Sequence, residues 1–416
     1  MPSDDATPMI LGPKSRAEKR LVMVSLGIAA GYLVALAAMF ARHSWVLGAD
    51  RRPIMTDFAA MWSAGSLARD GHALSAYDGR LQHAAEVATV GHQYQGYFGW
   101  NYPPSFLLVM VVLAGLPYAV AFVAWVASTL ALYVVSIAAL SRRWATLLAA
   151  LAAPWMLACA FTGQNGFLAA ALIGLVLLTM DERPILSGIL LGFLAFKPQF
   201  GFLFPFVLVA SGRWRVLAWA TVSTVSLTGL SIVVFGPDVF LAFLHNLALA
   251  TGGMLNDGQI PWYKLQSIYS MSRALGAPNS VGWCAQGAAA AACATMVVWL
   301  WRGGAPTALK AASLPVAAIL ATPYVFNYDL PILGVTMVLL YRQRSFDRLE
   351  YVVLGVAALV INAGFPIGLP LGLIAPLAFG AVVGRRVVAL QRGGSSLMSP
   401  SPIGARPSLA PPLIAP

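Results

Sequence analysis

Carboxylates are scarce in this chain, so those beside apolar segments are the first candidates for chemistry. Only 15 of the 416 residues are Asp or Glu. Asp57 lies in Thr56-Asp57-Phe58, just after the first apolar segment and at the start of a polar stretch that ends at Tyr102. Desolvation raises the pKa of a carboxylate and makes it a better proton acceptor near neutral pH. Asp57 is therefore our candidate general base, with a helix N-cap as the alternative interpretation.

A second acid and an isolated lysine have comparable settings. Asp329 follows Phe326-Asn327-Tyr328 between two apolar runs, where a substrate contact and a helix cap both fit. Lys197 is the only charged residue between Arg183 and Arg213. Charges inside membrane segments are costly and tend to mark function, so we expect Lys197 to bind a phosphate; snorkelling to the headgroups is the alternative. Further candidates for the phosphate come from a later polar loop, namely Lys264 and Arg273.

Two adjacent amides interrupt an apolar run at Gly163-Gln164-Asn165. Amides both donate and accept hydrogen bonds, as sugar hydroxyls require. Hydrogen bonding between helices would explain them equally well.

Several kinds of site are not predicted. The histidines show no HExxH or paired spacing, and the three cysteines have no CxxC spacing, so we predict neither a metal site nor a disulfide and expect the cysteines to be small core residues. The sequence also has no Walker loop, no dinucleotide-binding glycine fingerprint and no GxSxG motif. We therefore expect no cofactor, and a substrate that arrives through the lipid.

The elements that position these residues are membrane helices. Hydrophobic residues make up 59% of the chain and charged residues 10%, too little polar surface for a water-soluble fold. We predict an all-α polytopic membrane protein with about twelve spans. The apolar runs are 21–41, 105–140, 145–161, 166–180, 185–196, 199–211, 214–235, 283–301, 307–323, 329–341, 349–364 and 371–384.

The basic residues predict the orientation of these spans. The net charge is +11, but the Lys and Arg residues cluster beside apolar runs, which is the positive-inside pattern and does not indicate a nucleic-acid partner. Both termini are then cytoplasmic, and the opposite face receives 42–104, 162–165, 236–282, 322–329 and 362–368. We expect short helices in the long outer loops 42–104 and 236–282.

Three features complicate the count of spans. Run 105–140 is too long for one straight span and is divided at Pro117, so its number of crossings stays open. Several runs have only 12 or 13 residues and are interrupted at Gly163 and Pro198, which indicates broken helices lining a cavity. The compositions of 1–19 and 391–416 predict disordered cytoplasmic tails around a single domain, 20–390.

The motifs, taken in order, resemble those of glycosyltransferase family 87, the DUF2029 group of bacterial mannosyltransferases that use polyprenol-phosphate-mannose. The resemblance covers roughly residues 20–385. The motifs that carry it are Thr56-Asp57-Phe58 with Trp62 and Gly65, Gly71-His72 with Tyr77-Asp78, Tyr102-Pro103-Pro104, Leu116-Pro117-Tyr118, Gly163-Gln164-Asn165, Gly188 with Leu191-Gly192, Lys197-Pro198-Gln199, Gln266-Ser267, and Pro323-Tyr324 with Tyr328-Asp329.

The resemblance implies a GT-C fold in a bacterial plasma membrane and a catalytic aspartate in the first outer loop, a position that Asp57 matches. By the family's logic, Asp57 takes the proton of an acceptor hydroxyl while polyprenyl phosphate leaves with inversion, and cations hold the phosphate. Family members often carry a histidine just before the Tyr-Asp pair, where this chain has Phe326-Asn327. The residues that we expect to contact the substrate are Tyr102, Gln164, Asn165, Gln199, Gln266 and Asp329.

We therefore expect an extracytoplasmic-face glycosyltransferase that moves a sugar, most simply mannose, from a polyprenyl phosphate to a lipid-linked or envelope glycan acceptor. A transporter or flippase of lipid-linked sugars would use the same cavity and cation without breaking a bond. A catalytically silent scaffold is the third hypothesis.

Overall fold

The structure is a computed structural model whose described residues are 16–94, 98–141 and 143–392. Within these ranges the chain is helical, and its only extended pairs are isolated bridges such as that of Leu265 with Phe326. This confirms the all-α prediction. The predicted tails fall largely outside the described residues, since helix α1 begins at Arg16 and α20 ends at Arg392.

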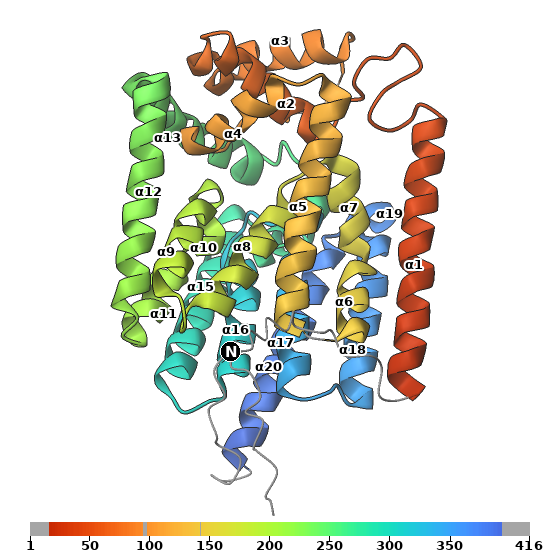
Figure 1. Cartoon of the computed structure of the whole chain (residues 1–416), viewed down its shortest axis with the longest axis vertical. Helices are drawn as coiled ribbons and strands as arrows, with labels where there is room; N and C mark the ends of the chain where they lie inside the picture. Colours follow the sequence, from red (N-terminus) through yellow and green to blue (C-terminus); the bar gives the residue numbers. More distant parts are fainter. Residues whose placement is uncertain (1–15, 95–97, 142, 393–416) are drawn as a thin grey trace, which may run out of the picture.

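Long helices form the frame of the molecule (Figure 1). They are α1 (Arg16–Ala41), α5 (Tyr118–Ser141), α12 (Trp214–Phe235), α13 (Pro237–Thr251) continued by the π-helical turn η3 (Gly252–Asn256), α15 (Asn279–Arg302), and α20 (Ile374–Arg392) preceded by η7 (Leu371–Leu373). Shorter helices pack between them. These are α6 (Trp144–Leu151), α7 (Pro154–Thr162), α8 (Gly166–Thr179), α9 (Pro184–Phe193), α10 (Pro198–Gly201), α11 (Phe204–Ala210), α14 (Ile268–Ala274), α16 (Thr307–Ala321), α17 (Ile332–Gln343), α18 (Arg348–Val360) and α19 (Gly364–Ile367).

Among the described residues, six of these segments are long and apolar enough to cross a membrane, or seven if the bent pair α6 and α7, which meet at 53°, forms one span. The other predicted spans coincide with shorter apolar helices of 10–17 residues or with short helices such as α11 and α18, so about twelve full-length spans are not seen. The helices break at both interruptions that the sequence indicated: α7 ends before Gly163, and α10 begins at Pro198.

A layer of short helices covers one end of the bundle, at the top of Figure 1. It contains α2 (Asp57–Arg69), η1 (Ala73–Tyr77), α3 (Gly79–Val90) and α4 (Pro104–Ala114). Run 105–140 is divided at Pro117 into α4 and α5, because proline cannot continue the hydrogen-bond ladder of a helix. Of the two helices only α5, with 24 residues, has the length of a span, whereas α4 packs beneath α2.

The second expected loop, 236–282, begins with an apolar helix. The segment Pro237–Asn256 has the length and hydropathy of a membrane span, so the assignment of all of 236–282 to a loop is corrected here. It packs against η1 and α4 of the covering layer. The remainder of this loop contains the 3-10 turn η4 (Trp262–Lys264) and the short helix α14.

The interior is built from helices that are apolar on all sides. In α8 nearly every residue from Gly166 to Leu177 is buried, and α16 is enclosed in the same way. Helix α1 is peripheral, with most of its apolar surface exposed for lipid. Two of the cysteines, Cys159 and Cys293, are buried core residues as predicted, whereas Cys284 is exposed.

Candidate active site

Contacts link the five segments that the sequence placed on one face. Gln164 hydrogen-bonds to Asp57, and Leu265 pairs with Phe326 through a β-bridge. The ring of Tyr263 packs edge-on against that of Phe365, with 5.3 Å between centroids. A side chain at Gly166 would collide with the carbonyl oxygen of Tyr328, so glycine permits this close approach. Residues from 42–104, 162–165, 236–282, 322–329 and 362–368 therefore share one region.

Asp57 is the first residue of α2, after Thr56 at the N-cap position. The Thr56 side chain makes no capping hydrogen bond, and the Asp57 carboxylate accepts a hydrogen bond from Gln164 Nε2 at 3.0 Å. Asp57 is half-buried, so part of its surface stays accessible. Its side chain faces the helix break at Gly163–Gly166, which a capping role alone does not require.

The electrostatic setting of Asp57 suits proton transfer. Burial raises the pKa of Asp57, and the hydrogen bonds it accepts and the charges of Lys264 and Lys197 partly oppose that rise. A raised pKa makes the carboxylate a stronger base, while the opposing contacts keep its ionised form accessible.

A chain of hydrogen bonds connects Asp57 through Gln164 to Tyr102. The Tyr102 hydroxyl donates to Gln164 Oε1 at 2.9 Å, which fixes the orientation of the amide that holds Asp57. Tyr102 is in turn held at its carbonyl oxygen by the Tyr77 hydroxyl, at 2.9 Å, and Trp125 Nε1 donates to the carbonyl oxygen of Gly163 at 2.9 Å. Gln164 is thus a positioning residue for the carboxylate.

Asn165 lies beside this chain of hydrogen bonds with an unsatisfied side chain. It is fully buried, and neither its Oδ1 nor its Nδ2 has a hydrogen-bond partner among the described residues. The amide lies close to the Tyr102 hydroxyl, outside hydrogen-bond geometry. Because buried polar groups are nearly always paired, such an amide favours a ligand that pairs with it.

Lys197 and Asp329 form a buried ion pair in the same region. Nζ of Lys197 lies 2.5 Å from Oδ1 of Asp329, with 4% and 1% of the two side chains exposed. The ammonium also lies over the rings of Tyr328 and Phe200, 5.2 and 5.7 Å from their centroids. Asp329 belongs to the 3-10 turn η5 (Asn327–Asp329), and its Oδ2 accepts from the backbone N–H of Phe326 at 3.0 Å. Asp329 therefore acts as a cap and as a counter-ion together.

The ion pair lies within electrostatic range of Asp57. Burial raises the pKa of Tyr328, and the negative charges of Asp57 and Asp329 add to the rise, so the phenol stays protonated. The pKa of Tyr102 is likewise raised by burial, while the charge of Lys197 opposes the rise. Tyr328 was not among the residues predicted to contact the substrate, although the Tyr328-Asp329 pair is one of the motifs that carry the family resemblance.

Not all of the remaining predicted site residues belong to the cluster around Asp57. Lys264, at the end of η4, is exposed and acts on Asp57 through its charge. Gln266 is buried two residues later, and half-buried Gln199 lies on α10, two residues after Lys197. The structure does not bring Arg273 into this cluster: its guanidinium donates to the Ala277 carbonyl oxygen at 2.8 Å and lies over the ring of Trp262.

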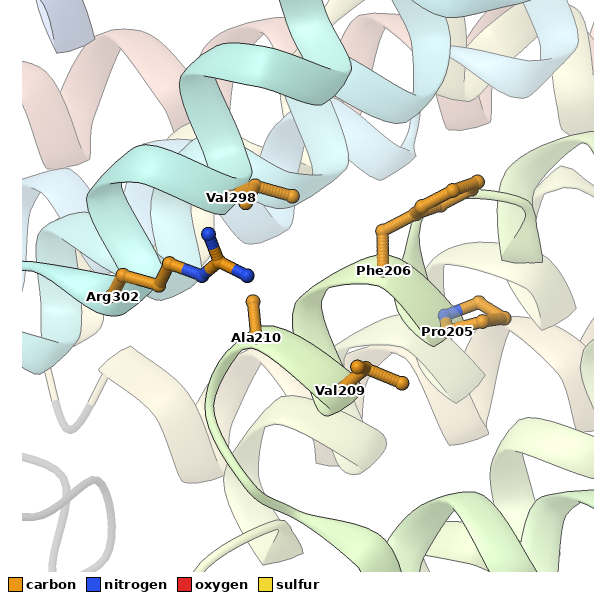
Figure 2. A pocket seen from close by; sticks show the side chains of 6 residues that line it. All are labelled: Pro205, Phe206, Val209, Ala210, Val298 and Arg302. Carbon is orange, nitrogen blue, oxygen red and sulfur yellow. The ribbon is translucent and has the colours of Figure 1, made fainter.

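A separate groove opens between α11 and α15, in the lower half of Figure 1 and away from α2 (Figure 2). The guanidinium of Arg302 borders a lining that is otherwise apolar. This lining offers no carboxylate or amide to activate a hydroxyl group. The residues that line it are Pro205, Phe206, Val209, Ala210, Val298 and Arg302.

Comparison with known proteins identifies the family. A family model described as glycosyltransferase family 87 matches residues 100–323, more than half of the 416-residue chain. No curated protein and no solved structure matches the chain. The matched range contains Gln164 and Lys197, whereas Asp57 and Asp329 lie outside it. The chain belongs to glycosyltransferase family 87 and is a membrane glycosyltransferase with the GT-C fold that this family implies.

Proposed function

We propose that the protein transfers a sugar, with mannose as the first candidate, from a polyprenyl phosphate to a hydroxyl group of a lipid-linked or envelope glycan, on the extracytoplasmic face of a bacterial plasma membrane. The observation that carries this proposal is the Asp57 carboxylate. It is half-buried, burial raises its pKa, Gln164 holds it by a hydrogen bond, and the charge of the buried Lys197 acts on it.

In the proposed reaction the acceptor oxygen attacks the anomeric carbon of the donor. The new carbon–oxygen bond forms as the bond from that carbon to the phosphate oxygen breaks, and the electron pair leaves with the polyprenyl phosphate. Asp57 takes the proton of the acceptor hydroxyl. Attack opposite to the leaving group inverts the anomeric configuration, as expected for a reaction with a single displacement and one base.

Lys197 and Lys264 are the proposed cations for the leaving phosphate. An ammonium has three donors, and Lys197 gives one to Asp329, so two remain for phosphate oxygens. Asp329 keeps the ammonium charged and in place. Exposed Lys264 adds a second positive charge on the side of Asp57. Together they stabilise the negative charge that develops on the leaving group.

The amides are proposed to orient the sugar and the acceptor. Asn165 offers an unpaired donor and an unpaired acceptor, while Tyr102 and Gln164 hold the base. Gln199 and Gln266 are proposed as further contacts on the two flanking segments. Arg273, being occupied by Ala277 and Trp262, is proposed to hold its loop.

The test is transfer of radiolabelled mannose from polyprenyl-phosphate-mannose to a membrane lipid extract by the purified protein. We expect product from the wild type and a loss of roughly 10²–10⁴-fold in Asp57→Asn, the usual contribution of a general base. Asp70→Asn is the matched control, because Asp70 is an exposed carboxylate at the other end of the same helix. Equal rates in wild type and Asp57→Asn would refute the role of the base. Labelled donor that crosses liposomes intact would support the transporter instead.

A further inference from the structure

Two amide oxygens meet at a glycine that none of the motifs above includes. A Cβ added to Gly372, in η7, would lie 2.6 Å from Oε1 of Gln266 and 2.7 Å from Oδ1 of Asn327. Both oxygens are buried, and neither has a hydrogen-bond partner among the described residues. Two acceptors without donors therefore flank the same point beside Gly372.

The orientation of Gln266 is fixed by its surroundings. Its Nε2 donates to the carbonyl oxygen of Tyr263 at 2.6 Å, and its backbone N–H donates to the carbonyl oxygen of Val325 at 2.6 Å. Only 1% of the residue is exposed. The amide cannot turn its oxygen toward the Tyr263 carbonyl without losing a hydrogen bond, so Oε1 stays directed at Gly372.

A buried amide elsewhere in the chain shows what a structural role looks like. Gln286 is 2% exposed, its Oε1 accepts from the backbone N–H of Tyr269 at 3.1 Å, and its Nε2 donates to the carbonyl oxygen of Leu320 at 2.9 Å. Both ends of that amide are paired. Gln266 is as deeply buried but leaves its acceptor end open, and a buried acceptor without a donor is costly.

The open oxygens adjoin the proposed reaction site. Asn327 begins the turn η5, which continues through Tyr328 to Asp329, the partner of Lys197. Gln266 lies two residues after Lys264, whose charge acts on Asp57. A hydroxyl group bound by these oxygens would therefore lie beside the two segments that carry Lys264 and Asp329.

We propose that Gln266 and Asn327 form a hydroxyl-recognition site for a pyranose ring, with the missing side chain of Gly372 allowing both oxygens to lie against the backbone at this point. Two carbonyl-type acceptors select a donor group, and sugar hydroxyls are the donors that a glycosyltransferase encounters. The inference rests on the proposed function and adds a specificity-determining residue, Asn327, at the position where the family resemblance departs. The hydroxyl belongs either to the donor sugar or to the acceptor glycan.

The test combines protein variants with modified sugars. Asn327→Leu keeps the size of the side chain and removes the acceptor. Gly372→Ala places a Cβ 2.6 and 2.7 Å from the two oxygens and therefore displaces both amides. We expect Asn327→Leu to raise the KM of one substrate roughly three- to ten-fold with a smaller change in kcat, since one neutral hydrogen bond is lost. We expect a larger loss in Gly372→Ala. A raised donor KM assigns the hydroxyl to the donor sugar, and a raised acceptor KM assigns it to the acceptor.

Monodeoxy sugars separate recognition from a merely structural effect. If Asn327 binds a hydroxyl group, then removing that hydroxyl from polyprenyl-phosphate-mannose or from the acceptor lowers kcat/KM in the wild type. In Asn327→Leu, the same removal causes no additional decrease. The inference is overturned if the loss from Asn327→Leu and the loss from the missing hydroxyl add up for every monodeoxy compound, or if Asn327→Leu leaves both KM values unchanged. The proposed function still stands in these cases as long as the wild type transfers mannose. If the wild type transfers no mannose, binding of the same donor and its deoxy analogues, followed by tryptophan fluorescence, applies the same criterion. If the wild type and Asn327→Leu then bind these compounds weakly and equally, both the hydroxyl-recognition site and the proposed function are overturned.

Discussion

Two buried ion pairs lie in different regions of this protein, and their surroundings differ. On the side of the basic clusters, Arg386 on α20 binds Glu350 on α18 through two hydrogen bonds of 2.9 and 2.7 Å. The same guanidinium donates to the carbonyl oxygen of Leu340 at 2.5 Å and to Gln343 Oε1 at 2.9 Å. Every polar atom of the pair thus has protein partners, which is the condition under which a buried pair is tolerated as structure.

The pair of Lys197 with Asp329 is joined by a single hydrogen bond of 2.5 Å and is bordered by aromatic faces. Around it, the polar atoms of Asn165, Gln266 and Asn327 include several that lack partners among the described residues. A saturated pair fixes helices, whereas an unsaturated one keeps donors and acceptors ready for a ligand. The contrast separates structure from function more clearly than burial does, since both pairs are almost fully buried.

Replacing Lys197 tests the contrast with the largest expected effect. Lys197→Met leaves Asp329 as an uncompensated buried charge, so we expect the protein to lose about 3–5 kcal/mol of stability. We also expect this variant to lose transfer activity. Lys197→Met combined with Asp329→Asn removes both charges and should recover most of the stability, while transfer per folded molecule stays about 10²–10³-fold below the wild type. Thermal unfolding in detergent and the mannose-transfer assay measure the two properties. Recovery of transfer in the double variant would make this pair structural too.

The Arg386 pair should respond in the opposite way. Arg386→Met leaves Glu350 buried with fewer partners, and we expect a loss of about 3–5 kcal/mol in stability. The rate per folded molecule should be unchanged, because every polar atom of this pair has a protein partner and the pair contacts neither Asp57 nor Gln164. Arg386→Met combined with Glu350→Gln should recover part of the stability. A drop in rate per folded molecule as large as that of the Lys197 double variant would remove the distinction between the pairs.

The sequence predicted the location of the candidate site better than its contacts. The positive-inside pattern predicted that five polar segments share one face, and contacts do link these segments to one another in the structure. An isolated lysine in an apolar run marked Lys197, but its partner Asp329 is 132 residues away, and no local pattern encodes such a distance. The same holds for Gln164 and Asp57, which are 107 residues apart.

Other features depend on packing that the sequence does not display. The segment Pro237–Asn256 was expected to belong to an outer loop because it follows the apolar run 214–235, yet its residues form an apolar helix against η1 and α4. In the sequence, Gly372 has no feature that distinguishes it from other glycines near a helix start. Its proximity to the oxygens of Gln266 and Asn327 appears only in the structure. The count of full-length spans fell short because several apolar runs form short or bent helices in the interior.

Gln164 supports the site without touching the ion pair and should give a smaller loss. Gln164→Leu removes the hydrogen bond to the Asp57 carboxylate and the anchor that Tyr102 provides. Hydrogen bonds to charged groups contribute about 1.5–3 kcal/mol, so we expect kcat/KM to fall about ten-fold or more with little change in unfolding temperature. Gln286→Leu, which removes a buried and fully paired amide, should instead lower the unfolding temperature and leave the rate per folded molecule unchanged.

The pH dependence of transfer gives the smallest but most specific effect. A general base must be deprotonated, so kcat/KM falls as the pH drops through the pKa of Asp57 in the folded protein. Burial raises that pKa, which places the acid limb above the ordinary aspartate value of about 4. The hydrogen bond from Gln164 stabilises the charged carboxylate and lowers the pKa, so Gln164→Leu should move the limb to higher pH. Arg386→Met should leave the acid limb of the pH profile unchanged, because the Arg386–Glu350 pair contacts neither Asp57 nor Gln164. An equal shift in both variants would show that the acid limb reports unfolding of the protein and not the protonation of Asp57.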